Sequence, residues 1–229
     1  MKIFYRGIFA LLVSIVMVSC SKDNATGEIQ ENEGANMNMS TSNKASGINY
    51  YEATKILSNE IGNNVPKLPL SQADVDYYAG LVHYEGQLQA AQANEVADHV
   101  AYAQEVGVRK YMDERMDYEE FTKETVLLIM GNNGPIENIE ASSEFRNLPK
   151  NEQKVILEVN KIARDYSEIM RSSNNRTVSC SANGQPAPCS FVGAAIGFMA
   201  GNSLCGIPCG VGGAILGGII GWAIGGGGK

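Results

Sequence analysis

Two histidines are the residues whose chemistry is easiest to test against the sequence. His99 lies four residues after Glu95, which places both side chains on one face of a helix, and Asp98 is adjacent. Imidazole and carboxylate groups together can bind a divalent metal ion. However, His83 is far away in sequence, no second pair of ligands follows, and the Glu-x-x-His spacing of di-iron bundles is missing. We therefore interpret Glu95 and His99 as a surface ion pair and expect no metal and no cofactor.

The ten tyrosines are a second group of residues that could bind a ligand. Two doublets, Tyr50-Tyr51 and Tyr77-Tyr78, could stack on sugars or peptides, although such residues more often pack in a core or at its rim. The chain has no nucleophile elbow, phosphate-binding loop or zinc-binding motif. We therefore expect that the protein is not an enzyme.

The amino terminus has the pattern of an export signal. Lys2 and Arg6 form a short basic region, and residues 7–19 form an apolar stretch of 13 residues. That stretch is too short for a hydrocarbon core of about 30 Å, which needs roughly 20 helical residues. We interpret residues 1–19 as a signal peptide and leave them out of the fold.

The residues at the end of this stretch, Met17-Val18-Ser19-Cys20, resemble the lipobox of bacterial lipoproteins. In that family, small residues precede a cysteine that receives diacylglycerol, and leucine is preferred where Met17 stands. The resemblance implies cleavage before Cys20, lipidation of its thiol and acylation of its amine. The partner of this end of the chain would then be a membrane. The alternative is an ordinary secretory signal followed by an incidental cysteine.

The residues after Cys20 bear on the location in the envelope. Ser21-Lys22-Asp23-Asn24 has no acidic residue directly after the cysteine, where enteric lipoproteins carry an inner-membrane retention signal. It is similar to the short charged export tag of surface lipoproteins of the Bacteroidota. The resemblance implies an outer-membrane anchor with the body exposed at the cell surface. Residues 20–47 lack an apolar period, and we interpret them as the lipidated cysteine and a flexible tether.

Charge divides the rest of the chain. The formal net charge of −7 becomes −9 when Lys2 and Arg6 are removed with the signal peptide, which argues against nucleic acid as a partner. From Thr177 to Gly228 there is no Asp, Glu, Lys or Arg. We therefore separate a helical bundle at 48–176 from a Cys/Gly-rich apolar segment at 177–229.

The bundle segment has the apolar spacing of helices and no alternation typical of a sheet. We expect helices at 48–61, from a capping box at Ser71 and Asp74 to Gly107, at 108–130 and at 150–171. The fold class predicted is mainly α: a small antiparallel bundle followed by a glycine-rich, disulfide-pinned helical hairpin.

The C-terminal segment carries glycines at intervals of four residues. Residues four apart share one helix face, so each series forms a stripe where another backbone can approach closely, the small-xxx-small logic of membrane helices. The stripes resemble the glycine zippers of envelope proteins and pore-forming peptides. The series are Gly193, Gly197 and Gly201; Gly206 and Gly210; and Gly213, Gly217, Gly221 and Gly225.

Glycine inside a helix costs about 1 kcal/mol relative to alanine, so an isolated hydrated helix with this sequence should fail. Either the segment packs against itself or the bundle, or it enters lipid. Helices at 190–204 and 210–225 would reach only roughly 22 and 24 Å, short of a comfortable membrane span. A hairpin that inserts conditionally or oligomerises, and one that is buried against the bundle, both remain open.

Four cysteines follow the lipidated one, which in an exported chain suggests two disulfides. Pairing of neighbours joins Cys180 to Cys189 and Cys205 to Cys209, whereas the alternative ties Cys189 to Cys205 or Cys209. Cysteines beside a glycine-rich apolar tail are also similar to those of small membrane-active bacteriocins, although those peptides are usually cationic.

Two functions follow from these patterns. The first is an envelope lipoprotein with a structural or interaction role, in which the hairpin serves close helix packing, self-association into a homo-oligomer or membrane contact. The second is a surface-displayed antibacterial toxin whose hairpin inserts into a neighbouring membrane.

Overall fold

The computed structural model describes residues 47–62, 67–86, 88–132, 134–172, 179–182 and 184–225, which belong to one compact unit. The predicted signal peptide, Cys20 and the tether up to residue 46 lie outside the described residues. Within these ranges the protein is mainly α-helical, as predicted, with one two-stranded antiparallel sheet.

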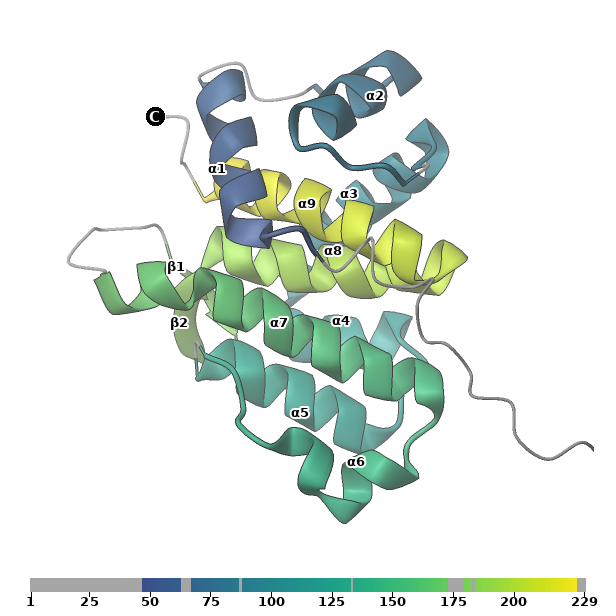
Figure 1. Cartoon of the computed structure of the whole chain (residues 1–229), viewed down its shortest axis with the longest axis vertical. Coiled ribbons are helices and arrows are strands. Elements are labelled where there is room, and N and C mark those ends of the chain that lie inside the picture. The colour runs from purple at the N-terminus through teal and green to yellow at the C-terminus, as the bar shows by residue number, and fades with distance from the viewer. Residues whose placement is uncertain are drawn as a thin grey trace, which may run out of the picture. The chain divides into compact units, whose positions relative to one another are not determined.

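The elements follow one another along the chain as shown in Figure 1. The first part contains α1 (Tyr50–Ile61), α2 (Gln72–Leu81), α3 (Ala90–Val106), α4 (Val108–Arg115), α5 (Glu120–Gly131), the 3-10 turn η2 (Ile139–Ala141), α6 (Ser143–Asn147) and α7 (Lys150–Ser172). The second part contains β1 (Ser179–Ala182), β2 (Gln185–Pro188), α8 (Cys189–Cys205) and α9 (Ile207–Ile224).

The hairpin formed by α8 and α9 crosses the middle of the fold, and the other helices cover it (Figure 1). Helix α3 contacts both members of the hairpin, α1 contacts α9, and α7 contacts α8. Helix α5 packs on α7. The bundle and the C-terminal segment therefore share one hydrophobic core, with the C-terminal hairpin at its centre.

The predicted helices at 48–61 and 150–171 are confirmed by α1 and α7. Asn49 caps α1 by accepting a hydrogen bond from the backbone N–H of Glu52. Helix α7 is amphipathic, and its apolar face is buried as expected. Between Lys150 and Ser167, the part of α7 whose burial is described, the fully buried residues are Val155, Ile156, Val159, Ile162, Ala163 and Tyr166.

The single long helix expected from Ser71 to Gly107 is wrong. The capping box of Ser71 and Asp74 is present, but α2 ends at Leu81, and His83 adopts a positive φ of 52°. The chain then returns to start α3 at Ala90. Left-handed backbone at a non-glycine residue is uncommon, so no local pattern indicates this turn.

The helix expected at 108–130 is also two helices, α4 and α5. Between them Met116 is extended and buried, which interrupts the helical ladder. The buried carboxylate of Glu152, on α7, accepts hydrogen bonds from the backbone N–H of Glu119 (3.0 Å) and the hydroxyl of Thr122 (2.5 Å). A side chain from another helix therefore caps the start of α5, and sequence proximity could not indicate it.

Candidate functional site: the buried glycine hairpin

The glycine stripes of α8 and α9 face each other within one chain. A Cβ atom added at Gly193 would overlap the carbonyl oxygen of Gly217, and the reverse is also true. The same reciprocal contact joins Gly197 and Gly213. Because the contacts on both sides are backbone atoms, neither helix can yield to a side chain at these positions. The two helices thus form one antiparallel interface. It contains three glycines of the predicted stripe on α8 and three of that on α9: Gly193, Gly197 and Gly201, and Gly213, Gly217 and Gly221.

The ends of this interface follow the same rule. A Cβ at Gly201 would overlap the carbonyl oxygen of Cys209, and one at Gly221 would overlap that of Cys189. At Gly225 it would lie 3.0 Å from the Cβ of Cys189. The close approach therefore extends from the base of the hairpin to its tip.

Two of the predicted glycines have different roles. Gly206 is the residue between the two helices, with a φ of 80° and no atom within 4 Å of an added Cβ. It supplies the left-handed turn of the hairpin rather than a packing face. Gly210 faces the ring of Phe198, 2.7 Å from an added Cβ, and the side chain of Asn202. The predicted pair of Gly206 and Gly210 is therefore not a stripe.

Two further glycines, outside the series of four, also admit close neighbours. Gly212 lies under the ring of Tyr84, and Gly218 lies under the Thr54 hydroxyl and the Tyr166 hydroxyl. Those two hydroxyls are hydrogen-bonded to each other at 2.7 Å. The sequence feature that could have indicated these contacts is the pair of glycine doublets at 212–213 and 217–218. In each doublet one glycine packs against α8 and the other packs against side chains of the surrounding helices.

Both disulfides join neighbouring cysteines, so the local pairing holds. Cys180 of β1 is bonded to Cys189 at the start of α8, with Cα atoms 4.8 Å apart. Cys205 is bonded to Cys209 across the turn at Gly206, with Cα atoms 5.6 Å apart. One disulfide therefore holds the base of the hairpin and the other holds its tip.

The hairpin is buried without interruption from Phe191 to Gly201 and from Cys209 to Gly221. Neither stretch has a charged residue. Among the described residues, α9 is the one helix that is long and apolar enough to cross a membrane, and 67% of it is buried inside the protein. An all-round apolar helix is typical of either a protein core or a lipid environment.

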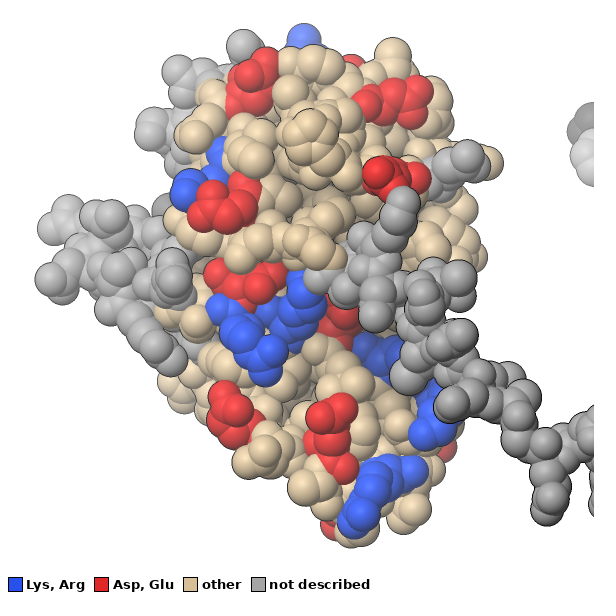
Figure 2. Space-filling view, viewed as in Figure 1, with Lys and Arg blue, Asp and Glu red and all other residues tan. Residues whose placement is uncertain are grey.

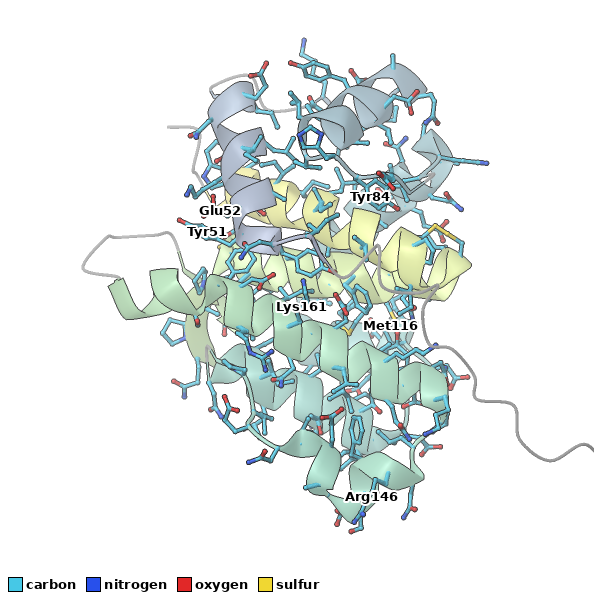
Figure 3. All side chains as sticks on the ribbon, in the orientation of Figure 1. Tyr51, Glu52, Tyr84, Met116, Arg146 and Lys161 are labelled. Atoms are coloured by element: carbon cyan, nitrogen blue, oxygen red, sulfur yellow. A yellow bond between two sulfur atoms is a disulfide. The ribbon has the colours of Figure 1, made fainter. Side chains whose placement is uncertain are left out.

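A polar network ties α1 to α7 beside the hairpin. The Tyr50 hydroxyl donates to Glu158 at 2.6 Å, and the Tyr50 backbone N–H donates to Asp165 at 3.0 Å. Lys161 donates to the carbonyl of Ile48 at 2.6 Å and lies 4.2 Å from the Tyr50 ring centre (Figure 3). Burial, and then the neighbouring Glu158, raise the pKa of Tyr50 far above its ordinary value, so the hydroxyl stays a donor.

His99 is paired with Tyr111 and not with Glu95. The Nδ1 atom of His99 lies 2.9 Å from the Tyr111 hydroxyl, and the two rings meet edge to face. Burial, followed by the nearby Arg115 charge, lowers the pKa of His99 below its ordinary value. In the described part of the chain no three His, Cys, Asp or Glu residues come together as a metal site would require.

The two tyrosine doublets do not lie together on one exposed surface. Tyr50 is fully buried, whereas Tyr77 is 51% exposed. The Tyr77 ring lies 5.6 Å from that of Tyr78, and its hydroxyl donates to Glu60 of α1. These tyrosines join helices to one another.

No protein-family model, no curated protein and no solved structure matches this chain.

Proposed function

We propose that this chain is a lipid-anchored protein of the bacterial outer membrane or cell surface with a structural or interaction role. In this proposal, Cys20 and the tether hold the body at the membrane. The C-terminal hairpin serves close helix packing inside that body. The observation that carries it is the reciprocal contact of the two stripes, which uses Gly193, Gly197, Gly213 and Gly217 within one chain.

A homo-oligomer built on the same glycines would have to separate α8 from α9 first. The disulfide of Cys205 and Cys209 closes the tip of the hairpin and opposes that separation. This favours packing within one chain over self-association through the stripe. It leaves the outer helices as the surface that meets a partner.

The outer surface suits a protein partner better than nucleic acid. On the face in Figure 2, the basic side chains lie beside acidic ones. Arg109, for example, is paired with both Glu120 and Glu124. Binding to nucleic acid instead requires concentrated positive charge.

Membrane insertion by a surface-displayed toxin is the second candidate, and the composition of α9 favours it. The 18 residues of α9 reach about 27 Å, close to a hydrocarbon core of about 30 Å. Most contacts between α8 and α9 are between their own backbone atoms. These contacts do not depend on the surrounding helices. The hairpin could therefore exchange a protein environment for lipid without losing its internal packing.

The anchor is tested by replacing Cys20 with alanine. Metabolic labelling with palmitate should give a labelled wild-type protein and an unlabelled Cys20→Ala variant, which should accumulate as precursor or as soluble protein. A Cys180→Ala variant is the matched control and should keep its label. Equal incorporation into Cys20→Ala would refute the lipoprotein proposal.

The role of the hairpin is tested with Gly217→Leu combined with Gly221→Leu. If the hairpin is a permanent core, wild type should release no dye from vesicles, and the double variant should have a lower melting temperature. If it inserts, wild type should release dye and the double variant should lose that activity. A double variant with leucine at Ile219 and Ile220 changes the same helix away from the stripe and is the control.

A further inference from the structure

The two disulfides differ in how far the protein covers their sulfur atoms. At the base of the hairpin Cys189 is buried, and a Cβ added at the buried Gly225 would lie 3.2 Å from its Sγ. Its partner Cys180 is half-buried and packs against the hydrophobic core. A thiolate must reach a sulfur atom directly to break a disulfide, so the fold protects this bond from external thiols.

The disulfide at the tip of the hairpin presents one of its two cysteines to solvent. Cys205, the last residue of α8, is exposed, whereas Cys209 is only 1% exposed. Beside Cys205, a Cβ added at Gly206 would have no atom within 4 Å, and Pro208 is exposed. The three residues between the cysteines carry no charge that would repel a thiolate. An approaching thiol therefore meets Cys205 first.

Cys209 is the leaving sulfur when Cys205 is attacked. It is the third residue of α9, whose N-cap is Gly206, and the backbone N–H of Gly210 donates to the Gly206 carbonyl at 3.0 Å. Cys209 therefore lies in the first helical turn, where backbone N–H groups have no acceptor within the helix and stabilise a thiolate. Burial of Cys209 acts against this stabilisation. The exposure of Cys205 is consequently what sets the direction of attack.

We propose that the Cys205–Cys209 disulfide is a thiol–disulfide exchange site whose substrate is a protein dithiol. One thiolate of the dithiol attacks the Sγ of Cys205 and forms a mixed disulfide with it. The bond to Cys209 breaks, and its electron pair and then a proton go to the Sγ of Cys209. The second thiolate of the dithiol attacks its neighbour in the mixed disulfide, which completes the partner's own disulfide and releases Cys205 as a thiol. Two electrons pass from the dithiol to this chain.

The exchange can proceed without unfolding the hairpin, because non-covalent contacts also hold its tip. A Cβ added at Gly201 would overlap the carbonyl oxygen of Cys209, so the two backbones touch next to the disulfide. The Tyr84 hydroxyl donates to the carbonyl of Pro208 at 2.5 Å. Neither contact depends on the bond between the sulfur atoms. The reduced protein should therefore stay folded and be able to return to the oxidised form.

The order of reduction tests the proposal, with the base disulfide as the control within the same molecule. Oxidised, full-length mature protein is incubated with reduced thioredoxin, a protein dithiol, and free thiols are alkylated at intervals and located by mass spectrometry. Cys205 and Cys209 should become alkylated at least about tenfold faster than Cys180 and Cys189, because access to sulfur limits the reaction. Equal rates, faster reduction at the base, or no reduction of either bond would overturn the proposal.

The site of attack is tested with Cys209→Ser and Cys205→Ser, which lack the same disulfide and each keep one thiol at the tip. The aromatic disulfide 5,5′-dithiobis(2-nitrobenzoate) should react with Cys205 in the first variant at least about tenfold faster than with Cys209 in the second. Circular dichroism melting compares the folding of the two variants. Equal or reversed reactivity in folded variants would overturn attack at Cys205. If either variant fails to fold, the order of alkylation in the wild-type protein decides.

Discussion

At the scale of single residues, the glycines of α8 and α9 are defined by what lies opposite them. Gly193 and Gly217 face backbone, Gly212 and Gly218 face tyrosine or threonine hydroxyls, and Gly206 faces nothing. Each interior glycine costs about 1 kcal/mol of helix stability relative to alanine. Backbone contact across the hairpin, which adds dispersion energy over many atoms, offsets that cost.

Gly217→Ala should therefore destabilise the protein. Its methyl group would overlap backbone atoms of α8, namely the Gly193 carbonyl and the Cα atom of Gly197. Overpacking of this kind costs about 1–3 kcal/mol. We expect a loss of about 2 kcal/mol in the free energy of unfolding, measured by denaturant titration. Gly80→Ala, in α2 with nothing within 4 Å, is the control and should gain up to about 1 kcal/mol. Equal effects of the two would mean that the stripe is not closely packed.

His99 should make stability depend on pH. Its pKa in the folded protein lies below its ordinary value of 6.5, because burial disfavours the charged ring. As the pH falls through about 6.5, the unfolded chain therefore binds more protons than the folded protein, and the free energy of unfolding decreases. His99→Gln should flatten this part of a melting-temperature profile.

At the scale of elements, short-range constraints act at both ends of the hairpin. The antiparallel pair of β1 and β2 brings Cys180 to Cys189, and the turn at Gly206 brings Cys205 to Cys209. The surrounding helices are instead held by long-range polar contacts, such as Glu152 to the start of α5. The disulfides thus tie β1 to the start of α8 and close the tip of the hairpin, whereas the surrounding helices are attached by non-covalent contacts.

Exported protein should have no free thiol among its four C-terminal cysteines. Peptide mapping by mass spectrometry should find Cys180 linked to Cys189 and Cys205 linked to Cys209. Chain-entropy arguments for loops of these lengths predict a loss of about 2–3 kcal/mol when Cys180 and Cys189 become serine, and about 2 kcal/mol for the other pair. A link from Cys189 to Cys205 or Cys209 would contradict the structure.

At the scale of the whole molecule, the part of the chain that is most apolar lies at the centre of the described fold, and the charged helices lie around it. The rings of Tyr166 on α7 and Phe191 on α8 are 5.8 Å apart, which illustrates how the bundle segment and the hairpin share one core. Helices α1, α3, α5 and α7 therefore have apolar faces turned toward the C-terminal hairpin.

A chain ended after residue 178 should consequently lose its fixed tertiary structure. Helices α1, α3 and α7 would expose the faces that contact α8 and α9, and exposed apolar surface of this kind binds hydrophobic dyes. We expect retained helical circular dichroism, strong dye binding and no cooperative melting. Removal of residues 226–229 alone, as a control, should leave the melting transition unchanged. A cooperatively folded 1–178 chain would show that the bundle is an independent domain.

The sequence by itself determined what depends on neighbouring residues. Helical periodicity predicted α1 and α7, the absence of charge marked the C-terminal segment, and the spacing of Gly193, Gly197, Gly213 and Gly217 predicted close helix packing. Each of these properties depends on residues that are close together in the sequence, so a local sequence pattern is enough to predict it.

The tertiary structure decided what depends on residues far apart in the chain. The break between α2 and α3 is accompanied by contact of Tyr84 with Pro208, 124 residues away, and Glu152 caps a helix 30 residues before it. The same spacing of four made Gly206 look like a packing residue, when it is the turn. The glycine pattern was compatible with lipid, with a second copy or with its own chain as the partner. Only the approach of the two backbones shows that, in this fold, α8 and α9 pack on each other.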